Sequence, residues 1–183
     1  MAVNLPLEQR QEIHAAAAPL RDVAPWVGWI PAEKLHMTIK FLGEQPEPAV
    51  EPMGVALRAA AREHAVIDLA GGGIGAFPNF RRPHVVWFGV EAHPRLELLH
   101  HDVEIACERL GVEVEGTTFR PHLTLGRIVR RPPVEARRAL AAARRQVTYR
   151  TEIRVESIDL MQSELLPGGA RHTLVAAAPL RVA

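Results

Sequence analysis

Two short motifs of the form His-x-Thr carry the residues of this sequence that are best suited to chemistry. Residues 36–39 read HMTI and residues 122–125 read HLTL. Alternate side chains of an extended strand share one face, so the histidine and the threonine of each motif point the same way, about 6.6 Å apart along the strand. The apolar residues between and after them then face the core. Each motif therefore presents an acid/base group and a hydroxyl donor on the open side of a strand.

These groups suit the hydrolysis of a cyclic phosphodiester. One neutral imidazole, from His36 or His122, takes a proton from the attacking water, while the other, in its charged form, gives a proton to the leaving oxygen. The hydroxyls of Thr38 and Thr124 can donate to the non-bridging phosphate oxygens and hold the phosphorus in line for attack. The scheme needs no metal and no cofactor, and carboxylates that could complete a metal site are sparse near either histidine in the sequence. The competing interpretation is that both are surface histidines beside threonines chosen for strand propensity.

The composition predicts one globular domain over residues 1–183. The chain is 48% hydrophobic and 23% charged, with a formal net charge of +1, so its overall field does not attract nucleic acid strongly. Phosphate binding must then depend on local groups of basic residues. The arginines at 137, 138, 144 and 145 are expected to lie on solvent-exposed helix faces. The absence of a long apolar run or a signal peptide predicts a cytoplasmic protein. The sequence has no heptad pattern that would call for an obligate partner, so we expect a monomer. The one cysteine, Cys107, is expected to fill the core.

Short strand-like runs alternate with alanine-rich helical runs, which predicts an α+β fold. Gly and Pro punctuate the elements, and residues 71–83 form a glycine- and proline-rich loop. Strands are expected at residues 2–5, 35–42, 66–70, 85–90, 122–129, 146–161 (possibly broken) and 172–178, with a turn at 167–169. Helices are expected at residues 7–20, 47–64, 93–110 and 134–145.

A weak internal repeat relates the two motifs. Residues 36–64 and 122–146 share the order strand, proline-rich turn and Ala/Arg-rich helix, and the copies start 86 residues apart. Such a duplication predicts two similar lobes that pack face to face, so that equivalent strand positions meet across a cleft.

Several segments together resemble the 2H phosphoesterase superfamily. The paired signatures are HMTIKFLG at residues 36–43 and PHLTLGR at residues 121–127, and the branch that they resemble most is the RNA 2′,3′-cyclic phosphodiesterases, also called 2′-5′ RNA ligases. GAFP at residues 75–78, SEL at 163–165 and PGG at 167–169 extend the resemblance over nearly the whole chain. One departure is the first strand, which is short here because only residues 2–5 precede Pro6.

The resemblance implies two α/β lobes related by a pseudo-twofold axis, with antiparallel sheets lining a central cleft. It implies hydrolysis of a 2′,3′-cyclic phosphate, on RNA ends or small cyclic nucleotides, to a 2′-phosphomonoester without a metal, and reversible 2′-5′ ligation in some members. It also implies that His36 is the general acid and His122 the general base. Arg127 would contact phosphate only if its strand twists or ends near Gly126, because simple alternation places it on the face opposite Thr124. For Phe41, alternation favours the core over stacking on a base.

Other functions remain open at this point. A binding module could capture a nucleotide or RNA end through the same groups without turnover. A related enzyme could open another cyclic phosphate, such as ADP-ribose 1″,2″-cyclic phosphate, or trim RNA ends. Ligation would share the site with hydrolysis, and it would have to be the reverse reaction, because the sequence has no GxxxxGK[ST] loop for ATP.

Overall fold

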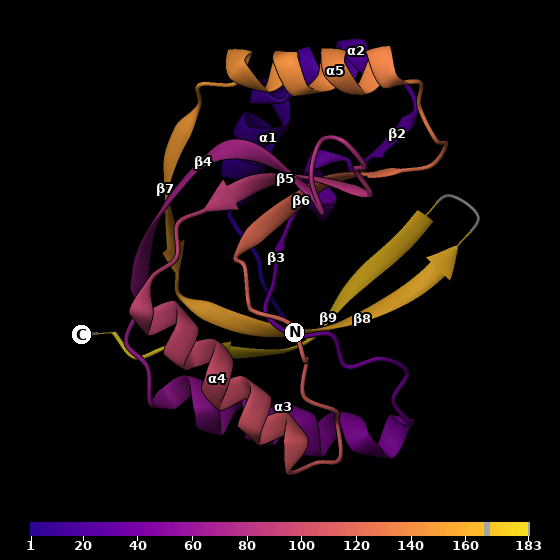
Figure 1. The fold of residues 1–183 in the computed structure, drawn as a ribbon. Coiled ribbons are helices and arrows are strands. Elements are labelled where there is room, and N and C mark those ends of the chain that lie inside the picture. The colour runs from indigo at the N-terminus through magenta and orange to yellow at the C-terminus, as the bar shows by residue number, and fades with distance from the viewer. Residues whose placement is uncertain (167–168, 183) are drawn as a thin grey trace.

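The computed structural model describes residues 1–166 and 169–182 and shows an antiparallel sheet with helices above and below it (Figure 1). The strands are β1 (Ala2–Val3), β2 (Val27–Trp29), β3 (Met37–Thr38), β4 (Ile67–Phe77), β5 (Val85–Val90), β6 (His122–Ile128), β7 (Arg150–Val155), β8 (Ser157–Leu166) and β9 (Gly169–Pro179). The helices are α1 (Leu7–Ala16), α2 (Ala18–Val23), α3 (Val50–Arg62), α4 (Pro94–Glu108) and α5 (Val134–Ala143), with 3₁₀ turns at Ala32–Lys34, Glu47–Ala49 and Arg144–Gln146. The predicted α+β class is confirmed.

The sheet brings the two motif strands together at its middle. Its strand order is β7-β4-β5-β6-β3-β1-β8-β9, and β2 pairs with β6 as well. The strands β3 and β6 are thus hydrogen-bonded neighbours, although the chain between them forms α3, β4, β5 and α4. The two motifs meet side by side within one sheet.

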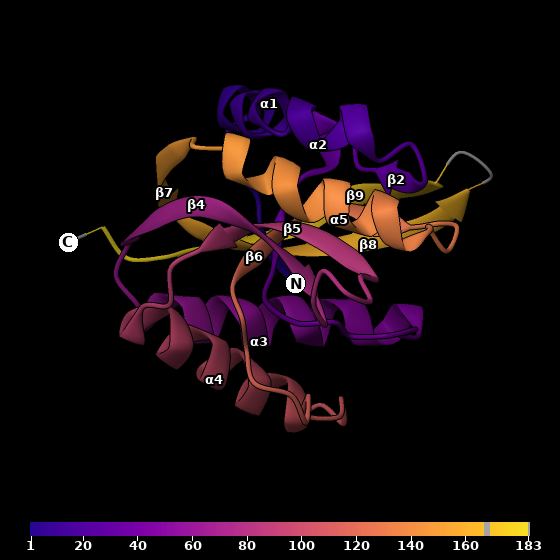
Figure 2. The same ribbon diagram turned by 45° about the horizontal axis from the view of Figure 1, so that its top comes forward.

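The predicted repeat is visible in the order of elements around this central pair. Strand β3 leads into α3, and β6 leads into α5. Helix α3 packs on β8, β9 and α4, whereas α5 packs on α2. Figure 2 shows α5 with α1 and α2 on one side of the molecule, and α3 with α4 on the other. Each copy of the repeat therefore contributes its helix to a different half of the fold.

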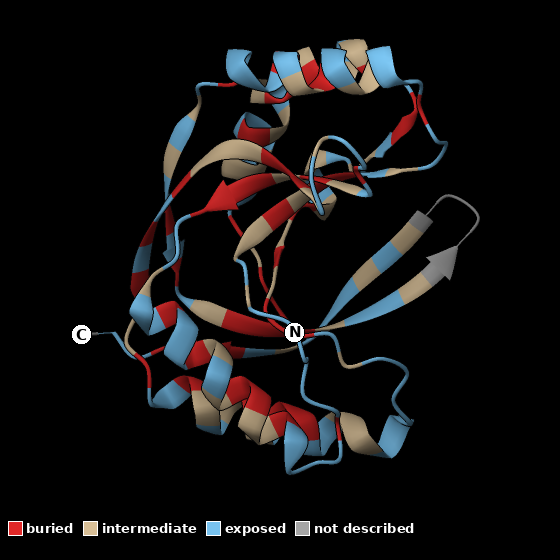
Figure 3. Ribbon diagram, viewed as in Figure 1, coloured by how far each residue is buried: buried red, intermediate tan, exposed pale blue. Residues whose placement is uncertain are grey.

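The core lies where these helices meet the sheet (Figure 3). Helix α3 buries Met53, Leu57 and Ala61 at four-residue spacing, the pattern of one helical face. Helix α4 buries Cys107, and burial raises the pKa of its thiol. The prediction that Cys107 fills the core is confirmed. None of the helices in the described part of the chain combines the length and hydropathy needed to cross a membrane.

The glycine-rich segment after residue 70 is a strand, which corrects the predicted loop. Strand β4 continues through it to Phe77 and pairs with β5, with a register shift between Gly71 and Ile74. This shift is a β-bulge, and Gly73 adopts a φ of 78° within it, a conformation that glycine reaches without steric cost. The glycines thus bend a strand and do not end one.

The strand predicted at residues 35–42 is regular only at Met37–Thr38. The backbone N–H groups of Ile39 and Lys40 both donate to the Met1 carbonyl, at 2.9 and 3.2 Å, so strict alternation stops there. Lys40 is fully buried, with its ammonium 2.8 and 2.9 Å from the two carboxylate oxygens of Glu104. As a result Phe41 points outward with 64% of its surface exposed, and the prediction that it lies in the core is wrong.

Three further differences have local causes. The helix predicted at residues 7–20 breaks at Ala17, because Pro19 in the first turn of α2 cannot continue the hydrogen bonding of α1. Strand β2 escaped prediction because only three of its residues pair. The turn predicted at residues 167–169 falls largely outside the described residues.

Candidate active site

The pairing of β3 with β6 places the two motifs on one surface. Met37 pairs with Leu123 in an antiparallel register, which sets His36 opposite Thr124 and Thr38 opposite His122. Met37 and Leu123 are fully buried, whereas the histidine and threonine of each motif are half-buried on the other side of the strands. We call this side, with its two histidines and two threonines, the motif face. In such a register the histidines are diagonal neighbours, about 7–8 Å apart at the backbone, so both side chains can reach one phosphate group.

Both histidines are oriented by the same local hydrogen bond. The Nδ1 atom of His36 lies 2.9 Å from the carbonyl oxygen of Lys34, and the Nδ1 atom of His122 lies 2.6 Å from that of Arg120. A carbonyl oxygen only accepts, so Nδ1 carries the proton and donates in each case. Each ring therefore keeps its Nε2 atom for proton transfer. In both motifs the ring is oriented by a hydrogen bond to the carbonyl two residues earlier, which leaves Nε2 available for general acid/base catalysis.

Burial lowers the pKa of both histidines below the usual value of 6.5. For His36, the hydrogen bond to Lys34 opposes this effect, while the nearby His172 adds to it. For His122, the bond to Arg120 opposes the effect of burial, and the positive charge of Arg127 adds to it. Near neutral pH each ring is therefore biased toward the neutral form, and an anionic phosphate between them would favour protonation.

A third histidine, His172 of β9, contacts His36. The two ring centroids are 5.1 Å apart and the rings meet edge to face at 72°. The Nδ1 atom of His172 lies 2.8 Å from the hydroxyl oxygen of Ser163 on β8. Strand β9 is three strands away from β3, roughly 14 Å in a flat sheet. The contact thus requires the β8–β9 hairpin to curl over the motif face, and Figure 1 shows it projecting from the rest of the sheet.

Aromatic rings flank His122 on the other side. Phe77, at the end of β4, meets the imidazole edge to face at 4.9 Å, and Trp87 of β5 lies 6.2 Å away. Trp87 lies across Gly75, where an added Cβ would stand only 2.0 Å from the indole ring. Any larger residue at that position would push the indole away. The indole nitrogen is buried and has no hydrogen-bond partner among the residues that the structure describes.

A β-bulge turns Arg127 onto the motif face. Val86 pairs with Gly126 but Trp87 pairs with Thr124, so Leu125 is an extra residue on β6. Beyond the bulge, Arg127 pairs with Val85, which lies on the same face of β5 as Trp87. Simple alternation would put Arg127 and Thr124 on different faces of β6, and it therefore fails here. The guanidinium is exposed and close enough to influence His122.

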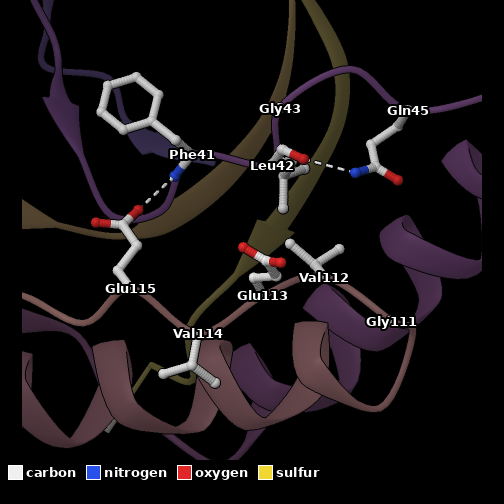
Figure 4. A pocket seen from close by; sticks show the side chains of 9 residues that line it. All are labelled: Phe41, Leu42, Gly43, Gln45, Gly111, Val112, Glu113, Val114 and Glu115. Carbon is white, nitrogen blue, oxygen red and sulfur yellow. Dashed lines mark hydrogen bonds between the residues drawn. The ribbon is translucent and has the colours of Figure 1, made fainter.

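A groove of about 490 Å³ is lined by neither of the two motif histidines (Figure 4). It is formed by the segment after the first motif, from Phe41 to Gln45, and by residues 111–115. Glu115 accepts a hydrogen bond from the backbone N–H of Phe41 at 3.0 Å, and Glu113 also lines the groove. Its two carboxylates disfavour a phosphate ligand.

Candidate metal ligands do not gather in the described residues: no group of three or more His, Cys, Asp or Glu side chains could hold an ion there.

The structure thus brings together all five residues that the sequence singled out for the site: His36, Thr38, His122, Thr124 and Arg127. Sequence reasoning missed His172, Phe77 and Trp87 as neighbours of the histidines. Phe77 could have been noticed within the GAFP segment. Nothing in the local sequence indicates that residue 172 reaches His36, because that contact depends on the curl of the hairpin.

Comparisons with known proteins agree with this geometry. Residues 6–165 match the family model for the 2′-5′ RNA ligase superfamily. An RNA 2′,3′-cyclic phosphodiesterase of Thermus thermophilus is 33% identical, over 98% of this chain and 88% of that protein. Another from Geobacillus stearothermophilus is also 33% identical, over 69% of this chain, and the match spans only 40% of that longer protein. A crystal structure of a Thermus thermophilus protein superposes with a TM-score of 0.77 at 28% identity, covering 99% of this chain and 96% of the other.

Proposed function

The chain belongs to the 2′-5′ RNA ligase superfamily, and on that premise we propose that it is an RNA 2′,3′-cyclic phosphodiesterase that opens the ring to a 2′-phosphomonoester. One observation carries the proposal. Two histidines stand diagonally on adjacent strands, each with Nδ1 bound to a carbonyl and with a threonine directly opposite on the neighbouring strand. This arrangement supplies two Nε2 atoms and two hydroxyls to a single phosphate.

The proposed mechanism assigns opposite roles to the two rings. Neutral His122 accepts a proton from water through Nε2 as the water oxygen bonds to phosphorus. Charged His36 donates its Nε2 proton to the 3′ oxygen as the bond from phosphorus to that oxygen breaks. The 2′ oxygen keeps the phosphate, and the two rings return to their starting states by exchanging protons with solvent.

The remaining groups hold the phosphate. The hydroxyls of Thr38 and Thr124 donate to the non-bridging oxygens, and Arg127 adds positive charge near the phosphate and His122. These donors stabilise the charge that develops on the oxygens as water attacks. A 5′ hydroxyl of a second RNA in the place of water would give a 2′-5′ linkage, which exchanges one diester for another without ATP.

The test uses 2′,3′-cyclic AMP and a short RNA with a 2′,3′-cyclic phosphate end, incubated with the purified protein in EDTA. Chromatography that resolves 2′- from 3′-phosphates should show the 2′-phosphate from both substrates. Formation of 3′-phosphate would mean that the 2′ oxygen is the leaving group and would contradict the proposed ring opening. Binding without any product would favour a binding module, and the absence of both would direct the search to other cyclic phosphates such as ADP-ribose 1″,2″-cyclic phosphate.

A further inference from the structure

Charge is unevenly distributed along a chain whose formal net charge is only +1. Residues 116–151, which include β6 and α5, contain nine arginines and a single acidic residue, Glu135. Residues 91–115, which include α4 and one wall of the groove in Figure 4, contain seven acidic residues and two arginines. Their helices, α5 and α4, lie on opposite sides of the molecule (Figure 2). The overall charge therefore conceals a basic half and an acidic half.

The basic half includes a connected group of arginines beside the motif face. The loop between β4 and β5 carries Arg81 and Arg82, and the Asn79 carboxamide oxygen accepts hydrogen bonds from both backbone N–H groups. Helix α5 holds this loop: Arg137 donates to the Arg81 carbonyl, and the Arg144 guanidinium lies 4.9 Å from the centre of the Phe80 ring. The segment after β6 adds two more side chains. We call the group formed by Arg81, Arg82, Arg130, Arg131, Arg137 and Arg144 the arginine surface.

The loop that carries Arg81 and Arg82 starts and ends next to strands of the site. It begins directly after Phe77, which contacts the His122 ring. The loop ends at His84, whose carbonyl accepts a hydrogen bond from Ile128 at 3.0 Å. Arg130 follows Arg127 by three residues, at most about 10 Å of extended chain. A ligand that leaves the motif face on the His122 side therefore meets the arginine surface.

Apart from Arg137 and Arg144, which hold the loop, these arginines have no local contact in the described residues that accounts for their charge. In the part of the chain that the structure describes, none of the six pairs with a carboxylate. All but Arg137 are exposed. Repulsion among neighbouring like charges destabilises a folded chain unless a polyanion neutralises it. A string of phosphates is such a polyanion, and guanidinium groups bind phosphate through paired N–H donors.

We propose that the arginine surface binds the phosphodiester backbone of RNA upstream of its 2′,3′-cyclic phosphate end, which makes RNA strands, and not mononucleotides, the preferred substrates. This inference rests on the proposed function, because only a ribose 2′ hydroxyl yields the cyclic end. The strand runs from the motif face over the β4–β5 loop toward α5. It avoids the acidic half, where Glu113 and Glu115 would repel it.

The experiment compares two substrates and two charge-reversed variants. The substrates are 2′,3′-cyclic AMP and a 12-nucleotide RNA with a 2′,3′-cyclic phosphate end. The test variant combines Arg81→Glu, Arg82→Glu and Arg130→Glu. The control variant makes the same change of charge on exposed arginines of the opposite half, with Arg62→Glu, Arg95→Glu and Arg109→Glu.

The test variant should lose at least tenfold in kcat/KM on the RNA and stay within twofold of the parent protein on cyclic AMP. Its RNA kcat/KM should also depend less steeply on salt, by about two units of the log–log slope for three lost phosphate contacts. The control variant should retain the RNA activity. Unchanged RNA activity in the test variant, an equal loss on both substrates, or an equal loss in the control would each overturn the proposal.

Binding separates this proposal from the proposed function. In the His122→Ala background, fluorescence anisotropy of a labelled 12-nucleotide RNA reports affinity without turnover. Tenfold weaker binding on adding the three test substitutions supports the arginine surface, even if the parent protein proves to have no hydrolase activity. Equal binding with and without them refutes it.

Discussion

His36 and His122 carry out complementary roles in the proposed reaction from different surroundings. His36 directly precedes a strand of two residues, β3, whose continuation is held by the buried pair of Lys40 and Glu104. His122 begins a seven-residue strand, β6, which has hydrogen-bonded neighbours along both edges. Both motif strands are paired on both edges, but β3 pairs over only one or two residues on each edge and is followed by a buried ion pair, whereas β6 is paired over most of its length.

The charged neighbours of the two histidines also differ. His36 faces another imidazole, His172, whereas His122 has the guanidinium of Arg127 nearby. A duplicated motif can thus retain its orienting hydrogen bond in both copies while each ring acquires its own electrostatic environment. In the proposed reaction these different surroundings would act on the acid and the base separately.

Removal of either imidazole should have the largest effect on catalysis. His36→Ala and His122→Ala should each lower kcat by at least about 10²-fold, the usual scale for one general acid or base. The exposed His101 of α4 supplies the control, and His101→Ala should keep full activity. Turnover of 2′,3′-cyclic AMP is the measurement. Near-normal rates in both site variants would refute the two-histidine mechanism.

Loss of the buried ion pair should test how the first motif is held. Lys40→Ala leaves the Glu104 carboxylate buried without its partner and should cost about 3–5 kcal/mol in the free energy of unfolding. Replacing both residues by methionine should recover much of this loss, because no uncompensated charge remains. Urea denaturation measures both. Arg154→Ala, which breaks an exposed pair with Asp68, should cost only a small fraction as much. Equal costs would mean that the buried pair does not anchor β3.

The two threonines should contribute nearly equally despite their different strands. Thr38→Val and Thr124→Val preserve shape but remove one donor to the phosphate, and each should lower kcat/KM by about tenfold, in line with one lost hydrogen bond to a charged group. Thr148→Val, at an exposed position outside the site, is the matched control. If only one of the two substitutions lowered kcat/KM, the phosphate would lie closer to that threonine than to the other.

The smallest expected effects concern pH and distinguish the acid from the base. Activity is lost as pH rises through the pKa of the acid, His36, and as pH falls through the pKa of the base, His122. Burial lowers both values below 6.5, so the kcat/KM profile of the free enzyme should be bell-shaped and displaced toward acid. It should be unchanged in EDTA.

Two neutral substitutions should move opposite sides of that profile. His172→Gln removes a charge that lowers the pKa of His36, so the alkaline limb should move to higher pH. Arg127→Gln removes a charge that lowers the pKa of His122, so the acid limb should move to higher pH. If His172→Gln moved the acid limb instead, the roles of the two histidines would be exchanged.

Much of the fold followed from local patterns. The helices at α3, α4 and α5 and the strands β5 and β6 lie close to their predicted ranges, because each has a clear apolar period and is bounded by Pro or a turn. Predictions failed where a distant contact overrides alternation. Phe41 is exposed because Lys40 takes the buried position beside Glu104, and the glycines of β4 form a bulged strand because β5 pairs with them.

The sequence by itself determined the two His-x-Thr motifs, the face that each histidine shares with its threonine, and the apolar residues behind them. These features depend only on the two-residue period of a strand. Tertiary structure alone decided that the motifs are antiparallel neighbours, that a bulge at Leu125 turns Arg127 toward Thr124, and that the β8–β9 hairpin brings His172 to His36. Register, bulges and sheet curvature arise from pairing between segments far apart in the chain, and no local pattern of residues encodes them.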